Sequence, residues 1–313
     1  MNKDRLTPCQ CLTPLLSRFL RFALVPIWNF FGLDAGLLAG ILAIDMGGYQ
    51  LAGELSASQE MVRYAGLVIA ATLGCTITFT IPVGMGMLKS GARLSRCMLI
   101  GTGTLPVTMI VGGLLSGLSF LQIVLQSLPV LLFCFLLMFG IWRFPEQTVR
   151  AFTVFADVIR LLTTIGLIAG AFCYMTGFSL LPDLAPLEDA MAVVSSIGIV
   201  LLGSLPTAEL LQRVLKKSLS FIGRKTGMND SSAAGLLMGI VSPVPAITMM
   251  EKMDERGKIV NAAFLVSAAS TIAAHMGFTF GTDPDFVVPL LVAKLAGGIA
   301  AVCAALFFTK KSA

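Results

Sequence analysis

Long apolar runs separated by short polar segments are the dominant pattern of this chain of 313 residues. A helix needs about 20 consecutive, mainly apolar residues to cross the hydrocarbon core of a bilayer. The pattern therefore predicts an all-α, polytopic membrane protein with about seven or eight transmembrane helices. The spans that it predicts are residues 61–88, 97–120, 121–142, 151–178, 190–211, 259–281 and 286–309.

Two further apolar segments, residues 34–52 and 231–250, are too short or too interrupted to cross simply. The first contains Gly47 and Gly48, and the second contains Ser242-Pro243-Val244-Pro245. Proline removes amide donors and breaks a helix. Broken backbone is tolerated at membrane depth only where it is buried in protein or lines a cavity. We therefore expect two re-entrant broken-helix hairpins.

Positive charges occur in every second connection between the spans. Connections 179–189 and 282–285 contain no lysine or arginine. The positive-inside rule places the basic connections and the C-terminus in the cytoplasm. The basic stretches are residues 89–96, 143–150, 213–225, 252–258 and 310–311.

The two broken segments lie about 195 residues apart and, by the charge pattern, enter the membrane from opposite sides. Such an arrangement is typical of an inverted-topology repeat. We expect one integral membrane domain over residues 1–313, with a first repeat at 12–120, linking helices at 121–178 and a second repeat at 187–309. The first repeat has no counterpart of span 190–211, so it is expected to be incomplete.

Composition narrows the class of function. Hydrophobic residues make up 56% of the chain and charged residues only 12%, against about 25% charge in a soluble domain. The net charge of +5 is explained by basic loops, so no nucleic-acid partner is expected. There is no nucleotide-binding loop and no catalytic motif, so neither an enzyme nor a cofactor is expected. One histidine and seven scattered cysteines predict no metal site.

Asp45 is the only residue between Gly36 and Ala52 that is charged at neutral pH. A charge within an apolar membrane segment is costly and usually faces a partner, a cavity or a substrate. Transporters place cation sites at such helix breaks. The alternative is a structural carboxylate that caps a helix or makes a hydrogen bond at the hairpin tip.

Six blocks of sequence occur in the order DMGGYQLA, TFTIPVGMG, GMNDSSAAG, MDERGKIVNAAFLVSAA, HMGFT and VAKLAGGIAAV. Together these blocks resemble the ethanolamine-utilisation permease family, EutH. The resemblance implies a cytoplasmic-membrane protein that passes ethanolamine into cells that degrade it. The chain departs from the family at Ala274, where an aspartate is usual before the histidine, and at Ser242 and Pro243, where asparagine usually precedes Ile-Pro.

Ethanolamine at neutral pH is a small ammonium ion with one hydroxyl group. Its site needs carboxylate or carbonyl oxygens, one polar group for the hydroxyl and an aromatic face for the cation. We assign Asp45 to the ammonium, Tyr49 to the aromatic face, and the backbone at Gly47 and Gly48 to carbonyl oxygens. The alternative role of the glycines is to let helices pack closely. The alternative role of the tyrosine is that of an ordinary packed aromatic residue.

Further candidates lie in the second repeat and along the path. Asn229, Asp230 and His275 are candidate substrate contacts. The alternatives are helix caps for the first two and a structural hydrogen bond for the histidine. The candidate path-lining residues are Thr76, Thr78, Thr80 and Ser242, with back-bonding to the preceding turn as the alternative for the threonines. Asp283 and Asp285 are expected in a solvated outer turn, and the alternative is that they attract cations at the entrance.

Two alternatives to ethanolamine transport remain open at this level. The first is a diverged transporter of another small amine or polar solute. The second is a non-transporting membrane paralogue with a structural or sensing role, which the incomplete first repeat would suit. The oligomeric state and any coupling ion are not predicted.

Overall fold

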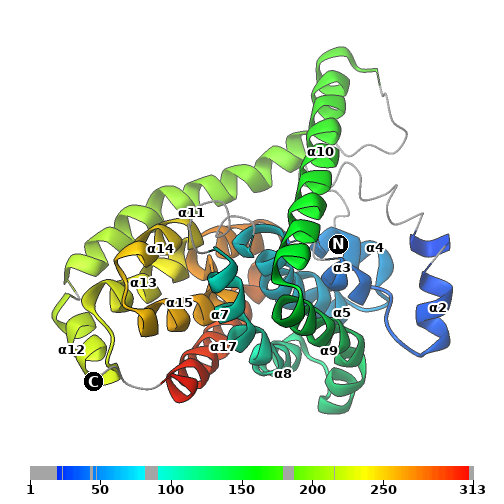
Figure 1. The fold of residues 1–313 in the computed structure, drawn as a ribbon. Helices are drawn as coiled ribbons and strands as arrows, with labels where there is room; N and C mark the ends of the chain where they lie inside the picture. Colours follow the sequence, from blue (N-terminus) through cyan, green and yellow to red (C-terminus); the bar gives the residue numbers. More distant parts are fainter. Residues whose placement is uncertain are drawn as a thin grey trace.

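The computed structural model describes residues 20–22, 24–42, 45–46, 48–81, 91–178, 187–214 and 216–309, and every regular element in these ranges is a helix (Figure 1). The label η marks a π- or 3₁₀-helical segment. The first half contains α2 (Val25–Phe30), α3 (Leu37–Ile41), α4 (Gly48–Leu55), α5 (Gln59–Arg63), η2 (Tyr64–Gly74), η3 (Thr76–Thr80), α7 (Gly91–Gly103), α8 (Leu105–Ser116), α9 (Phe120–Arg143) and α10 (Pro145–Thr176). The second contains α11 (Leu187–Val214), α12 (Lys216–Thr226), α13 (Asp230–Val241), α14 (Pro243–Met249), η4 (Met250–Lys252), α15 (Glu255–Ala268), η5 (Thr271–His275), α16 (Met276–Thr282), η6 (Pro284–Phe286) and α17 (Val287–Phe308).

The structure confirms the prediction of an all-α membrane protein. Four helical segments of the described chain are long and apolar enough to cross a bilayer, and each coincides with a predicted span. The other three predicted spans remain predictions, as does their total number. The four segments are Cys97–Ser116, Phe120–Arg143, Glu255–Thr282 and Pro284–Phe308.

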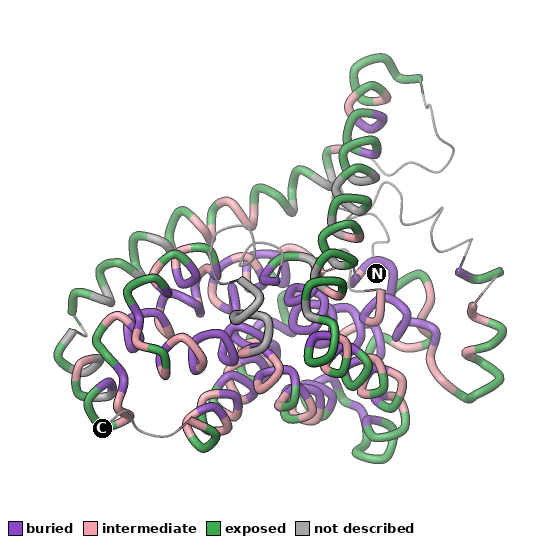
Figure 2. The backbone as a smooth tube through the Cα atoms, viewed as in Figure 1, coloured by how far each residue is buried: buried purple, intermediate pink, exposed green. Residues whose placement is uncertain are grey.

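Helix α9 shows how sequence produces a one-sided membrane helix. Ser119 begins it with a capping box, in which the serine and Gln122 satisfy each other's backbone amides. Buried positions recur every three or four residues, from Ile123 to Ile141, so they share one face. The opposite face exposes large apolar side chains, including Leu132 and Phe135. Such a surface suits lipid, and Figure 2 shows exposed positions running along α9, α10 and α11.

The centre of the protein is formed by η2, α15 and α17, which pack against one another and against α7 and α8. Every residue of η2 is buried, and so is every residue of α15 from Val260 to Ala268. A helix that is apolar on all sides belongs in the interior. The long helices α10 and α11 lie outside this centre, with α10 projecting away from it (Figure 1).

Helix breaks occur in both segments where the sequence predicts them. The chain leaves α3 after Ile41 and enters α4 at Gly48. Between α13 and α14, Ser242 is extended (φ −153°, ψ 135°) and Pro243 starts the next helix, as proline prefers. Re-entrant geometry and the two-repeat division depend on the position of the membrane, and they remain predictions.

A third break lies inside the predicted span 259–281 and was not expected. Helix α15 ends at Ala268, and Ser270 takes a left-handed conformation with φ 55°. Left-handed backbone is uncommon for residues other than glycine. The amide of Ser270 donates to the carbonyl of Gly239, 3.1 Å away on α13. The chain then continues as η5 and α16, so tertiary contact with α13 accompanies an interruption that apolar patterning alone did not reveal.

Candidate functional site

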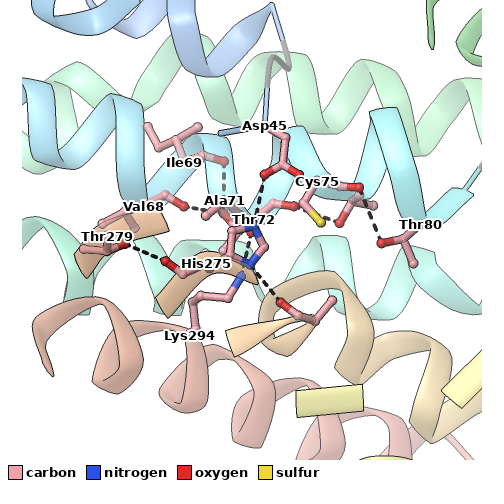
Figure 3. A network of polar contacts seen from close by, with 12 residues as sticks. Asp45, Val68, Ile69, Ala71, Thr72, Cys75, Thr80, His275, Thr279 and Lys294 are labelled. Atoms are coloured by element: carbon pink, nitrogen blue, oxygen red, sulfur yellow. Dashed lines mark hydrogen bonds and ion pairs between the residues drawn. The ribbon is translucent and has the colours of Figure 1, made fainter. Parts of the chain in front are cut away.

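Asp45 and His275 meet between the first broken segment and the third helix break (Figure 3). Asp45 Oδ1 lies 3.0 Å from His275 Nε2. The two residues are 230 positions apart in the sequence. The histidine side chain is 2% exposed and the aspartate side chain is 23% exposed. A buried imidazole therefore supports a carboxylate that solvent, or a small solute, can reach.

Close packing against η2 holds the segment around Asp45 in place. A Cβ atom added at Gly48 would lie 2.7 Å from Ala70 Cβ, and one at Gly66 would lie 2.5 Å from Tyr49 Cα. At Gly40 the same atom would lie 2.6 Å from Ile69 Cγ2. Only glycine lets the backbones approach this closely. The packing interpretation of Gly48 therefore has direct support, while Gly47 lies outside the described residues.

The break at Ser270 places His275 at the centre of the protein. The Nδ1 atom of His275 lies 3.1 Å from the carbonyl oxygen of Ala269, just before the break. With Nε2 against Asp45, both ring nitrogens have partners. Two fixed contacts orient the ring. The histidine predicted as a candidate thus reaches the predicted carboxylate.

Lys294 and Cys75 complete the cluster, and neither was a candidate from the sequence. Lys294 of α17 is fully buried, and its Nζ donates to the carbonyl of Ala71 at 2.6 Å. Its ammonium group is close enough to Asp45 and His275 for electrostatic interaction. Lys294 is a charge in an apolar run, which is the signal that identified Asp45. Cys75 is also buried, but cysteine in apolar spans is ordinarily a small hydrophobe, so no signal distinguished it.

The donor atoms of Asp45, Cys75 and His275 all lie within 4.8 Å of one another, which a metal ion would require. No fourth histidine, cysteine or carboxylate joins this group among the described residues. We interpret the cluster as a polar network with one accessible carboxylate and assign no metal to it.

A second network runs from Tyr49 toward the turn after α16. Gln59 Nε2 donates to the Tyr49 hydroxyl at 3.1 Å and lies 3.5 Å from Asp283 Oδ2. Asp283 accepts from Arg63 Nε at 2.6 Å and from its Nη2 at 3.0 Å. The expectation of a solvated Asp283 is wrong: its side chain is 7% exposed, because the arginine compensates its charge.

Tyr49 also uses its ring, which meets Phe278 edge to face with 6.3 Å between the ring centroids. This contact is compatible with the ordinary packing role. It leaves the assignment of the ring to a substrate cation as a prediction.

The path-lining threonines make the back-bonds that were the alternative interpretation. Thr76 Oγ1 donates to the carbonyl of Thr72 at 2.9 Å and lies 3.2 Å from that of Val266, across the interface with α15. Thr80 Oγ1 lies 3.4 Å from the carbonyl of Cys75. Both threonines are buried, and the side chain of Thr78 lies outside the described residues.

The remaining candidates lie on α13 and the break that follows it. Asn229 caps α13, since its Oδ1 accepts from the amide of Ser232 at 2.9 Å and its Nδ2 donates to the carbonyl of Lys252. Asp230 is exposed in the first turn. Ser242 is half-buried at the break, and its side chain makes no cap hydrogen bond. In the described part of the chain, no hydrogen bond joins these three residues to Asp45 or His275.

Comparison with known proteins gives a consistent result. The family model "Ethanolamine utilisation protein, EutH" matches residues 7–308. "Probable ethanolamine permease EutH" of Listeria monocytogenes is 37% identical, over 96% of this chain and 81% of the relative. The Escherichia coli protein of the same name is 33% identical, over 96% and 80%. "Uncharacterized protein YxeR" of Bacillus subtilis is 31% identical, over 95% and 81%.

No solved structure matches the chain significantly, so the family rests on the sequence matches. They cover nearly the whole chain and include the segments that carry Asp45, His275 and Lys294. The chain belongs to the ethanolamine utilisation protein EutH family.

Proposed function

We propose that this protein is a permease that carries ethanolamine across the cytoplasmic membrane for catabolism. The relatives of Listeria monocytogenes and Escherichia coli are named probable ethanolamine permease, and four helical segments of the described chain are long and apolar enough to cross a bilayer. This assignment makes the protein a transporter and not an enzyme. The ligand is the ethanolammonium ion, the main form of ethanolamine at neutral pH.

The observation that carries the proposal is the position of Asp45. It is a partly accessible carboxylate at a helix break, supported by a buried histidine. A carboxylate and the free carbonyls of a broken helix are the groups that hold small cations in transporters. The ammonium group of the substrate would donate to Asp45. Tyr49, in the first turn of α4, would offer its aromatic face to the cation.

We further propose that the two broken segments belong to inverted repeats, with the C-terminus in the cytoplasm. The helix breaks between α3 and α4 and at Ser242 support this arrangement. Access to Asp45 would then alternate between the two sides by movement of one repeat against the other. No nucleotide site is evident in the sequence, so the driving force would be a gradient.

The test is uptake of labelled ethanolamine at acidic pH, where little neutral amine crosses the lipid unaided. Asp45→Asn keeps the size of the side chain but removes its charge, and we expect uptake to fall by at least about tenfold. The matched control is Glu188→Gln, which neutralises an exposed carboxylate of α11 and should leave uptake unchanged.

The outcomes separate the alternatives. Undiminished uptake by the Asp45→Asn protein would remove Asp45 from the site. No ethanolamine uptake by the wild-type protein would favour a non-transporting role. Uptake of a different amine by the wild type, with ethanolamine excluded, would identify a diverged transporter.

A further inference from the structure

Both ring nitrogens of His275 face hydrogen-bond acceptors. Nδ1 lies 3.1 Å from the carbonyl oxygen of Ala269. A carbonyl oxygen can only accept, so Nδ1 must carry a hydrogen. That assignment leaves Nε2 as the atom whose proton is in question, and Nε2 lies 3.0 Å from Asp45 Oδ1.

The contact between Asp45 and His275 requires one further proton. With Nδ1–H fixed, a neutral imidazole has a lone pair on Nε2, and an ionised carboxylate also offers only lone pairs. Two acceptors at 3.0 Å repel. The contact forms either as imidazolium and carboxylate or as neutral imidazole and protonated carboxyl. In both cases the pair holds one shared proton and has no net charge.

An arriving ammonium ion offers N–H donors to the same carboxylate. Lys294 already places a positive charge against Asp45 and His275. If the pair kept its shared proton when the ammonium ion arrived, the cluster would gain one uncompensated positive charge. Such a charge is costly in a largely buried cluster.

We propose that an ammonium substrate binding at Asp45 displaces the proton shared by Asp45 and His275, so that the site exchanges one cation for one proton. The proposal rests on the proposed function, because it takes Asp45 as the ammonium site. The proton leaves Nε2 or Oδ1 for water at the exposed edge of Asp45. After the proton has left, His275 is neutral with its hydrogen on Nδ1, Asp45 is ionised, and the net charge of the cluster, now including the substrate, is unchanged.

The titratable and charged groups at this site come from four parts of the described chain. They are Asp45 between α3 and α4, Cys75 between η2 and η3, His275 of η5 and Lys294 of α17 (Figure 3). Lys294 is the main competing source of a released proton. Its Nζ donates to the carbonyl oxygen of Ala71. A substrate that binds at Asp45 does not compete for that hydrogen bond, so binding gives Lys294 no reason to lose its proton. His275 faces the carboxylate that the substrate must engage, so the exchange is assigned to the histidine.

Proton displacement makes binding depend on pH in a defined direction. Linkage is reciprocal. If binding of the cation displaces the proton, then binding of the proton must lower the affinity for the cation by the same factor. Where the pair holds its proton, the dissociation constant for ethanolamine should rise about tenfold for each unit by which pH falls.

The experiment measures ethanolamine binding to the purified full-length protein by calorimetry, near neutral pH, in buffers of different ionisation enthalpy. The slope of the observed binding enthalpy against the ionisation enthalpy of the buffer gives the number of protons released. The wild type should release about one proton per bound ion. His275→Gln keeps an amide that can donate to Asp45 but cannot titrate, so it should bind without releasing a proton. Lys294→Met removes the competing source and should retain the release.

Two results would overturn the proposal while leaving the proposed function intact. They are wild-type binding without proton release or pH dependence, and proton release that persists in His275→Gln. Loss of that persistent release in Lys294→Met would identify Lys294 as its source. Persistence in His275→Gln would also reveal substrate binding as the neutral amine. Absence of wild-type binding would instead reject the proposed function. If His275→Gln does not fold, the pH dependence of the wild-type affinity tests the proposal instead. A dissociation constant that does not rise as pH falls would then overturn it.

Discussion

Tyr49 connects the candidate site to the surrounding structure through both ends of its side chain. The ring packs against Phe278, and the hydroxyl accepts from Gln59. The ring supplies most of the apolar contact, whereas a single neutral hydrogen bond contributes only about 1 kcal/mol. The ring therefore matters more than the hydroxyl for holding α4 against α16.

Two substitutions at Tyr49 separate these contributions. Tyr49→Phe keeps the ring, so we expect ethanolamine uptake within roughly twofold of wild type. Tyr49→Ala removes the ring and should lower uptake several-fold, together with the melting temperature. Equal losses in both variants would show that the hydroxyl contacts substrate or closes a path, and the packing account would then be wrong.

At the scale of elements, the glycines of η2 and α4 determine how closely these helices approach. Gly66 faces the backbone of Tyr49, which cannot move aside as a flexible side chain would. Gly53 lies on the same α4 and has no atom within 4 Å of an added Cβ. The two positions therefore provide a matched comparison of crowding with intrinsic helix preference.

Gly66→Ala should destabilise the protein by about 1–3 kcal/mol, because the added methyl group overpacks the interface. It should also reduce uptake, since the segment that holds Asp45 must shift. Gly53→Ala should be neutral or slightly stabilising, as expected for replacing an exposed helical glycine. Thermal unfolding in detergent and uptake measure both effects. A Gly66→Ala protein of wild-type stability and activity would contradict the close approach.

The connection between α13 and α15 depends on the carboxylate of Asp254. Its oxygens accept from the amide of Asn229 at 2.9 Å, from Ser232 Oγ at 2.7 Å and from the amide of Gly257 at 3.1 Å. Burial raises the pKa of Asp254, but these hydrogen bonds outweigh burial, and the pKa is lower than its usual value. The carboxylate therefore stabilises the fold only while it is ionised.

A lowered folded-state pKa gives a definite sign to the pH dependence. The unfolded carboxyl titrates at about 3.9, so the stabilisation is complete above about pH 5. It is lost as pH falls through the folded-state pKa. The difference in melting temperature between wild type and Asp254→Ala should thus be constant above about pH 5 and shrink below about pH 4. A difference that does not change with pH would reject this role.

At the scale of the whole molecule, the Arg63–Asp283 ion pair joins parts of the chain 220 residues apart. Asp283 is buried and Arg63 is 28% exposed, with its guanidinium carbon 5.6 Å from the centroid of the Phe286 ring. The pair fixes the turn after α16 to the start of η2. The exposed Arg213–Glu209 pair of α11 provides a comparison, with side chains 75% and 54% exposed.

A double-mutant cycle on the free energy of unfolding measures the coupling energy of each ion pair. Arg63→Gln combined with Asp283→Asn should give a coupling energy of about 1–3 kcal/mol. Arg63→Gln leaves a buried carboxylate without its charged partner, and Asp283→Asn leaves the guanidinium without its carboxylate. Arg213→Gln with Glu209→Gln should give about 0.5 kcal/mol or less, since solvent screens the exposed pair. Equal coupling in the two cycles would remove the distinction that burial predicts.

The hydropathy pattern was sufficient to predict an all-α membrane protein, and it located the spans that α9, α15–α16 and α17 form. These features depend on local composition and on backbone hydrogen bonds within each helix, so the sequence alone contains them. The helix breaks near Gly48 and at Ser242 were predictable for the same reason, because glycine and proline act on the neighbouring backbone. The break at Ser270 depends on a contact with α13 and had no local signal.

The sequence by itself also identified Asp45 and His275 as unusual, since each is a polar group in an apolar run. Only the tertiary structure decided that they contact each other, that Lys294 and Cys75 lie beside them, and that Asn229 caps a helix away from this contact. Residues 45, 75, 275 and 294 are brought together by packing between η2, η5 and α17. Hydropathy acts along the chain, whereas a binding site depends on the distances between segments that are remote in sequence.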